Sequence, residues 1–310
     1  MGYDLAQDLS MASSTLSWRP VAVAACVLIA GCATAHRTPP PSAPSIGTAA
    51  STSSDTSDGS ECPAVPEAYV RALADARTPT AGEISRDLLA IAPETEGLRW
   101  SERGQVLMVT WAKPKYFRYQ PGEAFALHGD TFFTAVPEVQ EWCREFADRH
   151  PDGLVYRLHQ LLGLPPPAPG DDERAMVELW IDPRSFFRPC PDPEIFDHEC
   201  LIRVPLVGHG PLQPADDRPP WLCPRPSAPQ QVAGAFVQVN VDHLRWMCDR
   251  WQSSYGDACP ARRYPWTALG YTYDWGSPDD PRGPSEFVAP GHTEVVFHSL
   301  TSTEEYCGAR

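Results

Sequence analysis

Cysteine is the residue that most constrains how this chain can fold, because it occurs ten times in 310 residues. A cytosolic protein of this size seldom carries so many thiols unless they bind metal, whereas secreted proteins convert them into disulfides. Two of the ten, Cys26 and Cys32, lie in the N-terminal part of the chain, within and just after an apolar run. The other eight lie farther along, and this even number predicts up to four disulfides in an oxidising compartment.

The apolar N-terminal segment has the features of a secretion signal. Arg19 precedes the ten apolar residues Val21 to Ala30, a run that is too short to span a bilayer but fits the core of a signal peptide. The run ends in Ile29-Ala30-Gly31-Cys32, which resembles the lipobox of bacterial lipoproteins. The resemblance implies that residues 1–31 are a signal peptide and that Cys32 becomes the N-terminus and carries acyl chains such as palmitate.

Other interpretations of this segment stay open. Residues 1–10 contain two aspartates and no basic residue, so Met11 is a second candidate for the start of translation. A plain secretory cleavage near residues 33–35 is the alternative to lipidation. Ala33 rather than Asp follows Cys32, and by analogy with other lipoproteins this favours an anchor in the outer membrane, with the folded part facing the periplasm.

The segment after Cys32 has the composition of a tether. Residues 33–61 are rich in Ala, Ser, Thr and Pro, and Ile46 is their only large apolar residue. Such a segment buries too little surface to offset its ordering entropy, so we expect residues 32–61 to be a disordered tether and 62–310 to be one globular domain. The chain has a net charge of −15, which argues against nucleic acid as its partner.

Hydrophobic periodicity predicts a mixture of helices and strands in the domain. Apolar residues at helical spacing predict helices over 65–77, 82–91, 137–149, 154–162 and 241–253. Shorter apolar or alternating runs predict strands over 104–112, 130–136, 175–181, 200–207, 234–239, 268–275, 285–289 and 293–298. Because helices and strands do not alternate one for one, we expect an α+β fold with a mostly antiparallel sheet, several short flanking helices and long Pro-rich loops.

Loop-closure entropy guides the pairing of the eight cysteines, since bonds between residues close in sequence cost least. It predicts Cys190–Cys200 and Cys248–Cys259. The remaining four cysteines would then pair as Cys143–Cys307 and Cys62–Cys223. A zinc site is the alternative, but the chain has no CxxC pair and no histidine at zinc-finger spacing.

The densest polar cluster lies on the Pro-rich segment 188–200, where four carboxylates and one histidine occur within eight residues. Such oxygens suit Ca²⁺, and a histidine beside them would extend the choice to other divalent metals. Paired acids can also divide acid and base roles if burial separates their pKa values. A solvated acidic loop closed by a disulfide is the simplest interpretation. The cluster consists of Asp192, Glu194, Asp197, His198 and Glu199.

A second constellation lies between residues 264 and 287. Tyr271, Tyr273 and Trp275 alternate, so on a strand they would share one face, as in an aromatic platform for a sugar ring. Asp274 and Glu286 could form a glycosidase-like pair if about 5–9 Å separates their carboxyl groups. The alternative is that the aromatic row is part of the core.

Three stretches, at 157–166, 187–195 and 264–276, are similar to a group of bacterial secreted proteins and lipoproteins of unknown function. The similarity would extend over about residues 100–307. It implies no activity and assigns no catalytic residue.

We therefore expect a lipid-anchored envelope protein that binds or supports another component, such as cell-wall glycan or an envelope protein. The rival expectation is a periplasmic hydrolase that acts through the carboxylates named above. An enzyme would bring several of these groups into one cleft with raised carboxylate pKa values, whereas a binding or structural module would scatter them.

Overall fold

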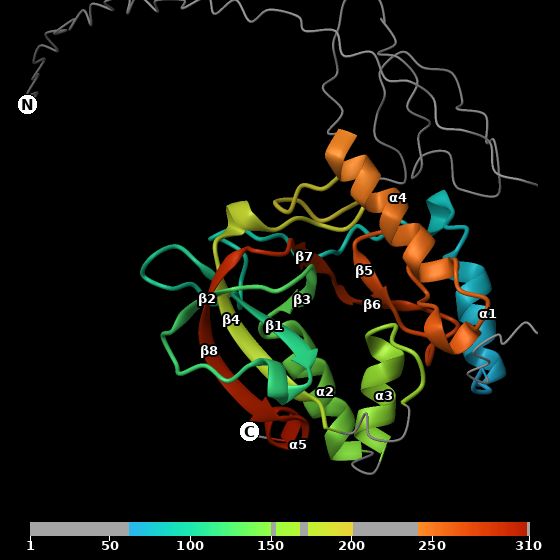
Figure 1. The fold of residues 1–310 in the computed structure, drawn as a ribbon, viewed down its shortest axis with the longest axis horizontal. Coiled ribbons are helices and arrows are strands. Elements are labelled where there is room, and N and C mark those ends of the chain that lie inside the picture. The colour runs from blue at the N-terminus through green and yellow to red at the C-terminus, as the bar shows by residue number, and fades with distance from the viewer. Residues whose placement is uncertain (1–61, 150–152, 168–172, 201–240, 309–310) are drawn as a thin grey trace, which may run out of the picture. The chain divides into compact units, whose positions relative to one another are not determined.

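An antiparallel sheet of six strands organises the residues that the computed structural model describes, which are 62–149, 153–167, 173–200 and 241–308 (Figure 1). These residues belong to one compact unit, Asp58–Arg310. The strand order is β2-β8-β4-β1-β3-β7, and a second sheet pairs β5 with β6. The strands are β1 Val106–Ala112, β2 Ala124–Ala126, β3 Thr131–Ala135, β4 Ala175–Ile181, β5 Tyr271–Tyr273, β6 Arg282–Ser285, β7 Phe287–Ala289 and β8 Glu294–Ser302.

Four helices occur where apolar residues recur every three or four residues, namely α1 Glu67–Ala76, α2 Glu138–Arg149, α3 Leu154–Leu161 and α4 Val241–Tyr255. A short helix, α5 Thr303–Gly308, follows β8. Short 3₁₀ turns occupy Ala81–Glu83, Pro114–Tyr116, Pro183–Ser185 and Pro260–Arg262. The prediction of an α+β fold with a mostly antiparallel sheet and flanking helices is confirmed.

The expected helix over 82–91 is wrong, because tertiary contacts take its backbone groups. Beyond the turn that ends at Glu83, the Leu88 amide donates to the His198 carbonyl at 2.9 Å and the Ile91 amide donates to the Ile195 carbonyl at 2.7 Å. Leu88 and Ile91 are both buried. The periodicity of these residues therefore reflects packing against another loop rather than a helix face.

Strand boundaries also differ from the sequence pattern in two places. The strand expected over 268–275 is only three residues long, and the strand expected over 285–289 is divided at Glu286 into β6 and β7. The periodicity did not indicate β2 or α5, which are three and six residues long. The strands expected at 200–207 and 234–239 lie outside the described residues, Cys200 apart.

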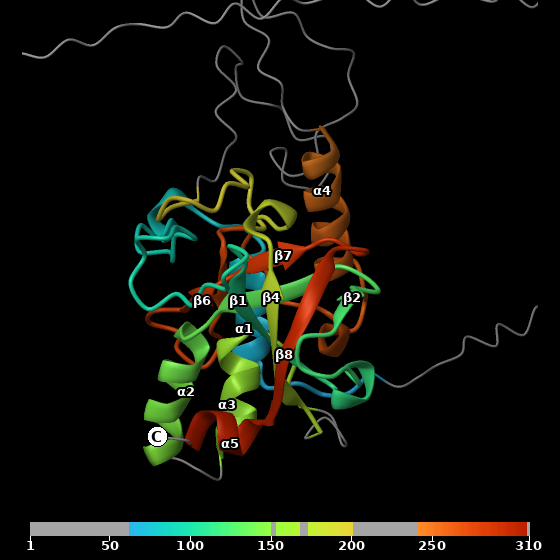
Figure 2. The same ribbon diagram turned by 90° about the vertical axis from the view of Figure 1, so that its left-hand side faces the viewer.

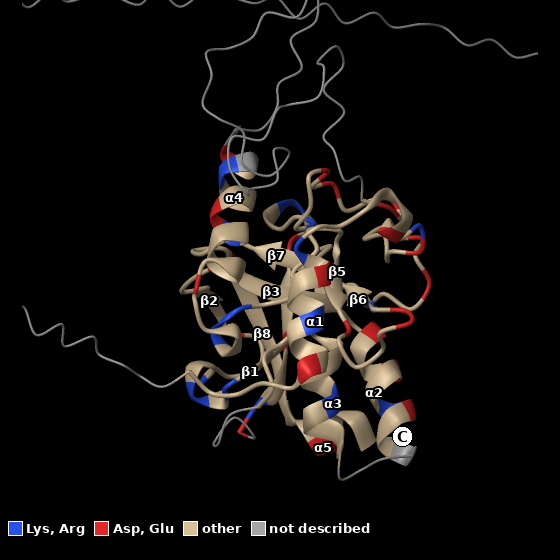
Figure 3. Ribbon diagram, turned by 90° about the vertical axis from the view of Figure 1, so that its right-hand side faces the viewer, with Lys and Arg blue, Asp and Glu red and all other residues tan. Residues whose placement is uncertain are grey.

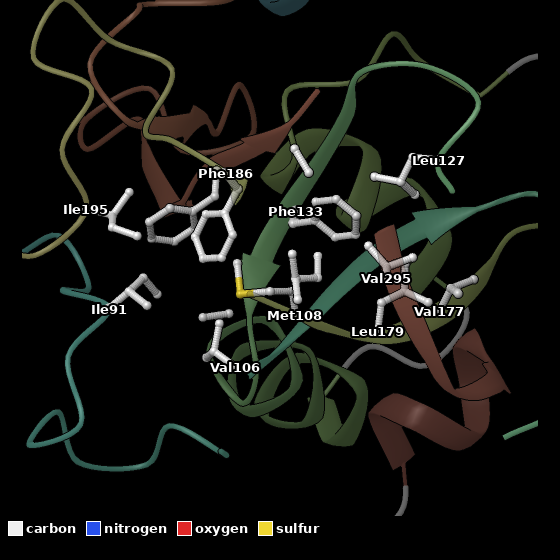
Figure 4. Close-up of a cluster of buried hydrophobic side chains, with 14 of the residues drawn as sticks. Ile91, Val106, Met108, Leu127, Phe133, Val177, Leu179, Phe186, Ile195 and Val295 are labelled. Carbon is white, nitrogen blue, oxygen red and sulfur yellow. The ribbon is translucent and has the colours of Figure 1, made fainter. Parts of the chain in front are cut away.

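The central strand β1 is buried on both faces, which explains its continuous apolar sequence. Val106 and Met108 pack into one cluster with Phe133 and Phe186, as Figure 4 shows. Leu107 belongs to the opposite cluster, which α2, α3 and α5 cover (Figures 1 and 2). Full burial of each such side chain contributes about 1.5–3 kcal/mol.

A third cluster joins α1 and α4 to the segment that leads into β5. Tyr69 on α1 packs with Met247 and Trp251 on α4 and with Trp266. The Tyr69 hydroxyl also donates to the Arg263 carbonyl at 2.5 Å. This cluster holds α4 and the 263–266 segment together beside the sheet.

The disulfides follow this packing rather than sequence distance alone. Cys190–Cys200 and Cys143–Cys307 are present as predicted. The predicted Cys248–Cys259 and Cys62–Cys223 bonds are wrong, because Cys62 is bonded to Cys259 across a separation of 197 residues. The packing of α1 on α4 brings these two Cα atoms to 5.5 Å. Cys248 is itself disulfide-bonded, while Cys223 lies outside the described residues.

Charged residues lie mainly on helices and connecting loops, and the strands of the sheet are largely uncharged (Figure 3). Among the residues that the structure describes, no helix combines the length and apolar character that crossing a bilayer requires.

Candidate functional site

A cavity of about 160 Å³ lies where the sheet meets the third cluster. Its walls come from elements far apart in the sequence, and we call it the Glu286 cavity. The residues that matter below are Val139 on α2, Phe132 on β3, Arg250 on α4, Tyr264, Trp266 and Glu286. Aromatic and aliphatic side chains form most of the rest of the lining.

Glu286 reaches this cavity because it lies at the junction of β6 and β7. Its amide donates to the Gly270 carbonyl at 2.9 Å. Neighbouring residues of an extended chain point to opposite sides, and Ser285 accordingly faces away from the cavity. The Ser285 amide and hydroxyl donate to Oε1 of Glu138, at 2.9 and 3.2 Å.

The Glu286 carboxyl is enclosed and under-satisfied. The residue is 9% exposed, and its Oε2 atom has no hydrogen-bond partner among the described residues. Burial raises the pKa of Glu286 from 4.5 to about 7, and the nearby charge of Arg250 opposes this rise. The carboxyl group therefore takes up or releases a proton close to neutral pH.

Arg250 brings a cation into the same cavity. Its guanidinium carbon lies 4.5 Å from the ring centroid of Phe132 and 5.7 Å from that of Tyr264, so aromatic faces stabilise the charge. Its buried Nε atom has no hydrogen-bond partner within the part of the chain described. Burial lowers the pKa of Arg250, whereas electrostatic interactions with Glu286, Tyr264 and Asp130 raise it. No ion pair between Arg250 and Glu286 occurs in the described ranges.

Trp266 supplies the third polar atom of the cavity. Its backbone is fixed by Tyr255, whose hydroxyl donates to the Trp266 carbonyl at 2.7 Å and accepts from the Trp266 amide at 2.9 Å. The indole is near enough to Glu286 to favour the carboxylate form. However, the buried Nε1 atom makes no hydrogen bond of ordinary geometry with any described residue.

The cavity therefore combines a titrating acid, a cation and an indole donor within apolar walls, and each group has a buried atom that makes no hydrogen bond of ordinary geometry with a described residue. Such a combination can hold the polar group of a small molecule and enclose its apolar part. A carboxyl group with a pKa near neutrality can also transfer a proton. Arg250 was missed from the sequence, whereas Tyr264 and Trp266 lie within the second constellation but were given no role there. The available signal was a cation at helical spacing from Trp246 and Met247, on the face that α4 buries.

Asp274, the expected partner of Glu286, has a different role. It does not line the cavity, and Arg157 holds its carboxylate through two hydrogen bonds, at 2.6 and 2.5 Å. The Gly276 amide donates to the same carboxylate at 3.0 Å. Among the lining residues described, Glu286 is the only carboxylate, so they hold no glycosidase-like acid pair.

The acidic loop at 192–199 is arranged around a buried arginine. Arg188 is fully buried, and its guanidinium donates to the backbone carbonyls of Glu194 and Asp197 at 3.2 and 2.9 Å. Burial and neighbouring carboxylates raise the pKa values of Asp192 and Glu194. These interactions give the loop a structural anchor.

His198 and Glu199 take part in the same loop structure. A ring nitrogen of His198 lies 2.7 Å from the Leu88 carbonyl, and the Glu199 amide donates to the Asp197 carboxylate at 3.1 Å. None of the five cluster residues lines the Glu286 cavity. In the described part of the chain, no group of three His, Cys, Asp or Glu residues is placed to hold a metal ion.

The aromatic row on β5 and directly after it is buried rather than presented as a platform on the surface. Tyr271, Tyr273 and Trp275 are 2%, 6% and 3% exposed. Their polar atoms are satisfied by the Glu83 carbonyl, the Asp75 carboxylate and the Leu164 carbonyl, respectively. The two tyrosines line the Glu286 cavity, while Trp275 packs against Tyr69 and Tyr156.

Comparison with known proteins reveals no relative. No family model matches the chain, and neither a curated protein nor a solved structure matches it. The functional argument therefore depends on the residues of the cavity. Cys32, the expected lipidation site, lies outside the described residues.

Proposed function

We propose that this chain is a lipid-anchored protein of the bacterial cell envelope whose domain binds a small molecule in the Glu286 cavity. The lipobox-like sequence ending at Cys32 supports the anchor, and the disulfides are those of a protein in an oxidising compartment. The anchor would hold the domain at the outer membrane, facing the periplasm.

One observation carries the binding function, namely three buried polar atoms around one cavity that make no hydrogen bond of ordinary geometry with any described residue. They are Glu286 Oε2, Arg250 Nε and Trp266 Nε1. An unsatisfied buried polar group costs about 1–3 kcal/mol, so natural domains seldom gather several at one place without a use for them. A ligand that supplies complementary groups would recover this cost on binding.

Binding is better supported than hydrolysis. Hydrolysis of a glycosidic bond by the usual route needs two carboxyl groups flanking the bond, and Glu286 is the one carboxylate among the described lining residues. The other candidates, including Asp274 and the 192–199 loop, make structural contacts elsewhere. We therefore assign Glu286 to ligand recognition.

The binding function is tested by filling the cavity. Val139 lines it from α2, so Val139→Phe adds bulk to the cavity, whereas Val155→Phe on α3 adds the same bulk outside the lining. Ligand-observed NMR on the oxidised full chain would use benzoate, benzamide, benzyl alcohol and glucose as probes. We expect at least one probe to bind the wild type and Val155→Phe but not Val139→Phe. Equal binding to all three proteins, or to none, would contradict the proposal.

The anchor is tested separately by fractionation of bacterial cells that express the chain. We expect the wild type in the membrane fraction, with its mature N-terminal peptide starting at acylated Cys32, and Cys32→Ser in the soluble periplasmic fraction. Equal membrane partition of the two proteins would argue against lipidation at this site.

A further inference from the structure

The polar groups of the Glu286 cavity are mainly hydrogen-bond donors. The Arg250 guanidinium and the Trp266 indole can only donate, and a protonated Glu286 adds an O–H donor. Threonine hydroxyls in the lining can donate or accept. The complementary ligand group is therefore one rich in acceptors.

Charge restricts that group further. Arg250 is half-buried and makes no ion pair with a described residue, although Glu286 and Asp130 act on it from nearby. A cation that is partly removed from water and lacks a direct counter-ion is costly. Glu286 compensates only in part, because burial raises its pKa to about 7. With Glu286 neutral, the cavity carries one positive charge, which a single anionic group would balance.

The walls define the rest of the ligand. Phe132 and Tyr264 flank the guanidinium, and Val139 and Met176 contribute aliphatic surface. The body of the ligand must therefore be apolar and small enough for a cavity of about 160 Å³. A sugar would place several hydroxyl groups against these walls without partners.

We infer that the ligand is a small monocarboxylate with an apolar body, whose carboxylate lies against Arg250 and accepts hydrogen bonds from Arg250, Trp266 and protonated Glu286. A planar carboxylate matches the fork of a guanidinium, which makes such pairs stronger than neutral hydrogen bonds. This inference depends on the proposed binding function and adds the chemical class of the ligand.

Binding of such an anion is linked to proton uptake. The charged groups that act on Glu286 are Arg250 on α4 and the ligand itself, and Arg250 in turn faces Tyr264 and Asp130. An anion beside Glu286 raises the pKa of its carboxyl group above the value of about 7 in the free protein. Affinity is therefore highest below neutral pH and falls as pH rises through 7.

Isothermal titration calorimetry on the oxidised full chain tests the inference with matched probes. Acetate, isobutyrate, benzoate and phenylacetate are each compared with the corresponding amide. We expect at least one carboxylate to bind about tenfold or more tightly than its amide, equivalent to about 1.4 kcal/mol. Its affinity should fall about tenfold between about pH 6 and pH 8. Titration in buffers of different ionisation enthalpy should show uptake of close to one proton per ligand at about pH 8.

Three variants separate the roles of the charged residues. Glu286→Gln keeps an N–H donor but cannot titrate, so it should bind the carboxylate without proton uptake or pH dependence. Arg250→Met keeps the apolar stem of the side chain and should lose the preference for carboxylate over amide. Arg245→Met serves as the control, because Arg245 is exposed on the same helix and pairs with Asp242; it should behave as wild type.

The outcomes distinguish the ligand class from the binding function. Amides that bind as tightly as their carboxylates throughout, or affinity that rises with pH, would overturn the monocarboxylate. Binding of glucose or benzyl alcohol alone, abolished by Val139→Phe, would also overturn it while leaving the binding function intact. If none of the probes binds, the binding function itself fails, and the ligand class fails with it.

Discussion

Arg157 on α3 and Asp274, directly after β5, form a two-pronged ion pair in which the arginine side chain is 16% exposed and the carboxylate 5%. The guanidinium of Arg157 also lies over Trp142 on α2, with its carbon 4.7 Å from the ring centroid. The pair thus joins the helices on one face of the sheet to the strand that borders the Glu286 cavity.

Removing one partner of this pair should destabilise the domain without abolishing ligand binding. Asp274→Asn leaves the buried guanidinium of Arg157 without its counter-ion, and we expect unfolding free energy to fall by about 3 kcal/mol. Glu67→Gln breaks the exposed Glu67–Arg71 pair and should cost less than about 1 kcal/mol. Urea unfolding of the oxidised proteins measures both effects. Equal losses of unfolding free energy in the two variants would show that the Arg157–Asp274 pair stabilises the domain no more than an exposed pair does.

Stability should depend on pH through Glu286. The folded state raises the pKa of this carboxyl from 4.5 to about 7, so it binds the proton more tightly than the unfolded chain does. Protonation of Glu286 therefore contributes about 3 kcal/mol to the unfolding free energy below about pH 4.5. This contribution is lost as pH rises to about 7.

Glu286→Gln isolates this effect, because a glutamine does not titrate. Between about pH 4.5 and pH 8, the unfolding free energy of the wild type should fall by about 3 kcal/mol more than that of this variant. Urea midpoints across this range give the comparison. Parallel curves for the two proteins would exclude Glu286 as the titrating group. Glu138 has its pKa raised to about 7 by burial as well, so both proteins retain its contribution.

Gly270 should tolerate no side chain, because it lies against Arg188. It has φ = +77°, and a Cβ atom there would lie 2.7 Å from the Cδ atom of the fully buried Arg188. Gly104→Ala is a matched control, since Gly104 has φ = +73° but a methyl group there would meet no atom of the described residues within 4 Å. We expect about 1 kcal/mol of loss for Gly104→Ala from backbone strain, and at least about 2 kcal/mol more for Gly270→Ala. Equal losses in chemical denaturation would mean that Arg188 moves aside.

Disulfide mapping checks the third cluster. Non-reducing proteolysis followed by mass spectrometry should yield peptides linked through Cys62–Cys259, Cys143–Cys307 and Cys190–Cys200. Because Cys248 is also disulfide-bonded, we expect a further linked peptide that contains Cys248. A peptide that links Cys248 to Cys259 would contradict the packing of α1 on α4.

Local patterns predicted the elements whose form depends on nearby residues. The helix at 138–149 follows from one apolar face, and Cys190–Cys200 follows from a short loop. The expected helix at 82–91 failed because its amides pair with carbonyls at 195 and 198, more than a hundred residues away. A local stretch of sequence cannot predict hydrogen bonds between residues so far apart.

In the candidate site, too, some features followed from local sequence and others only from tertiary contacts. Glu286 was a candidate from the sequence, because an acid stands beside an aromatic strand. Its proposed partner Asp274 proved to be bound by Arg157, and its true neighbour Arg250 comes from α4. Which charges meet depends on how helices pack on the sheet, and spacing along the chain does not encode that geometry.

The sequence by itself determined the class of fold, most element positions, the Cys190–Cys200 disulfide and Glu286 as a candidate acid, because periodicity, loop length and residue chemistry act locally. Only the tertiary structure decided that Cys62 reaches Cys259 and that Arg250 and Trp266 meet Glu286. Those contacts arise when apolar faces far apart in the chain are buried together, and the same burial gives Glu286 its pKa near neutrality.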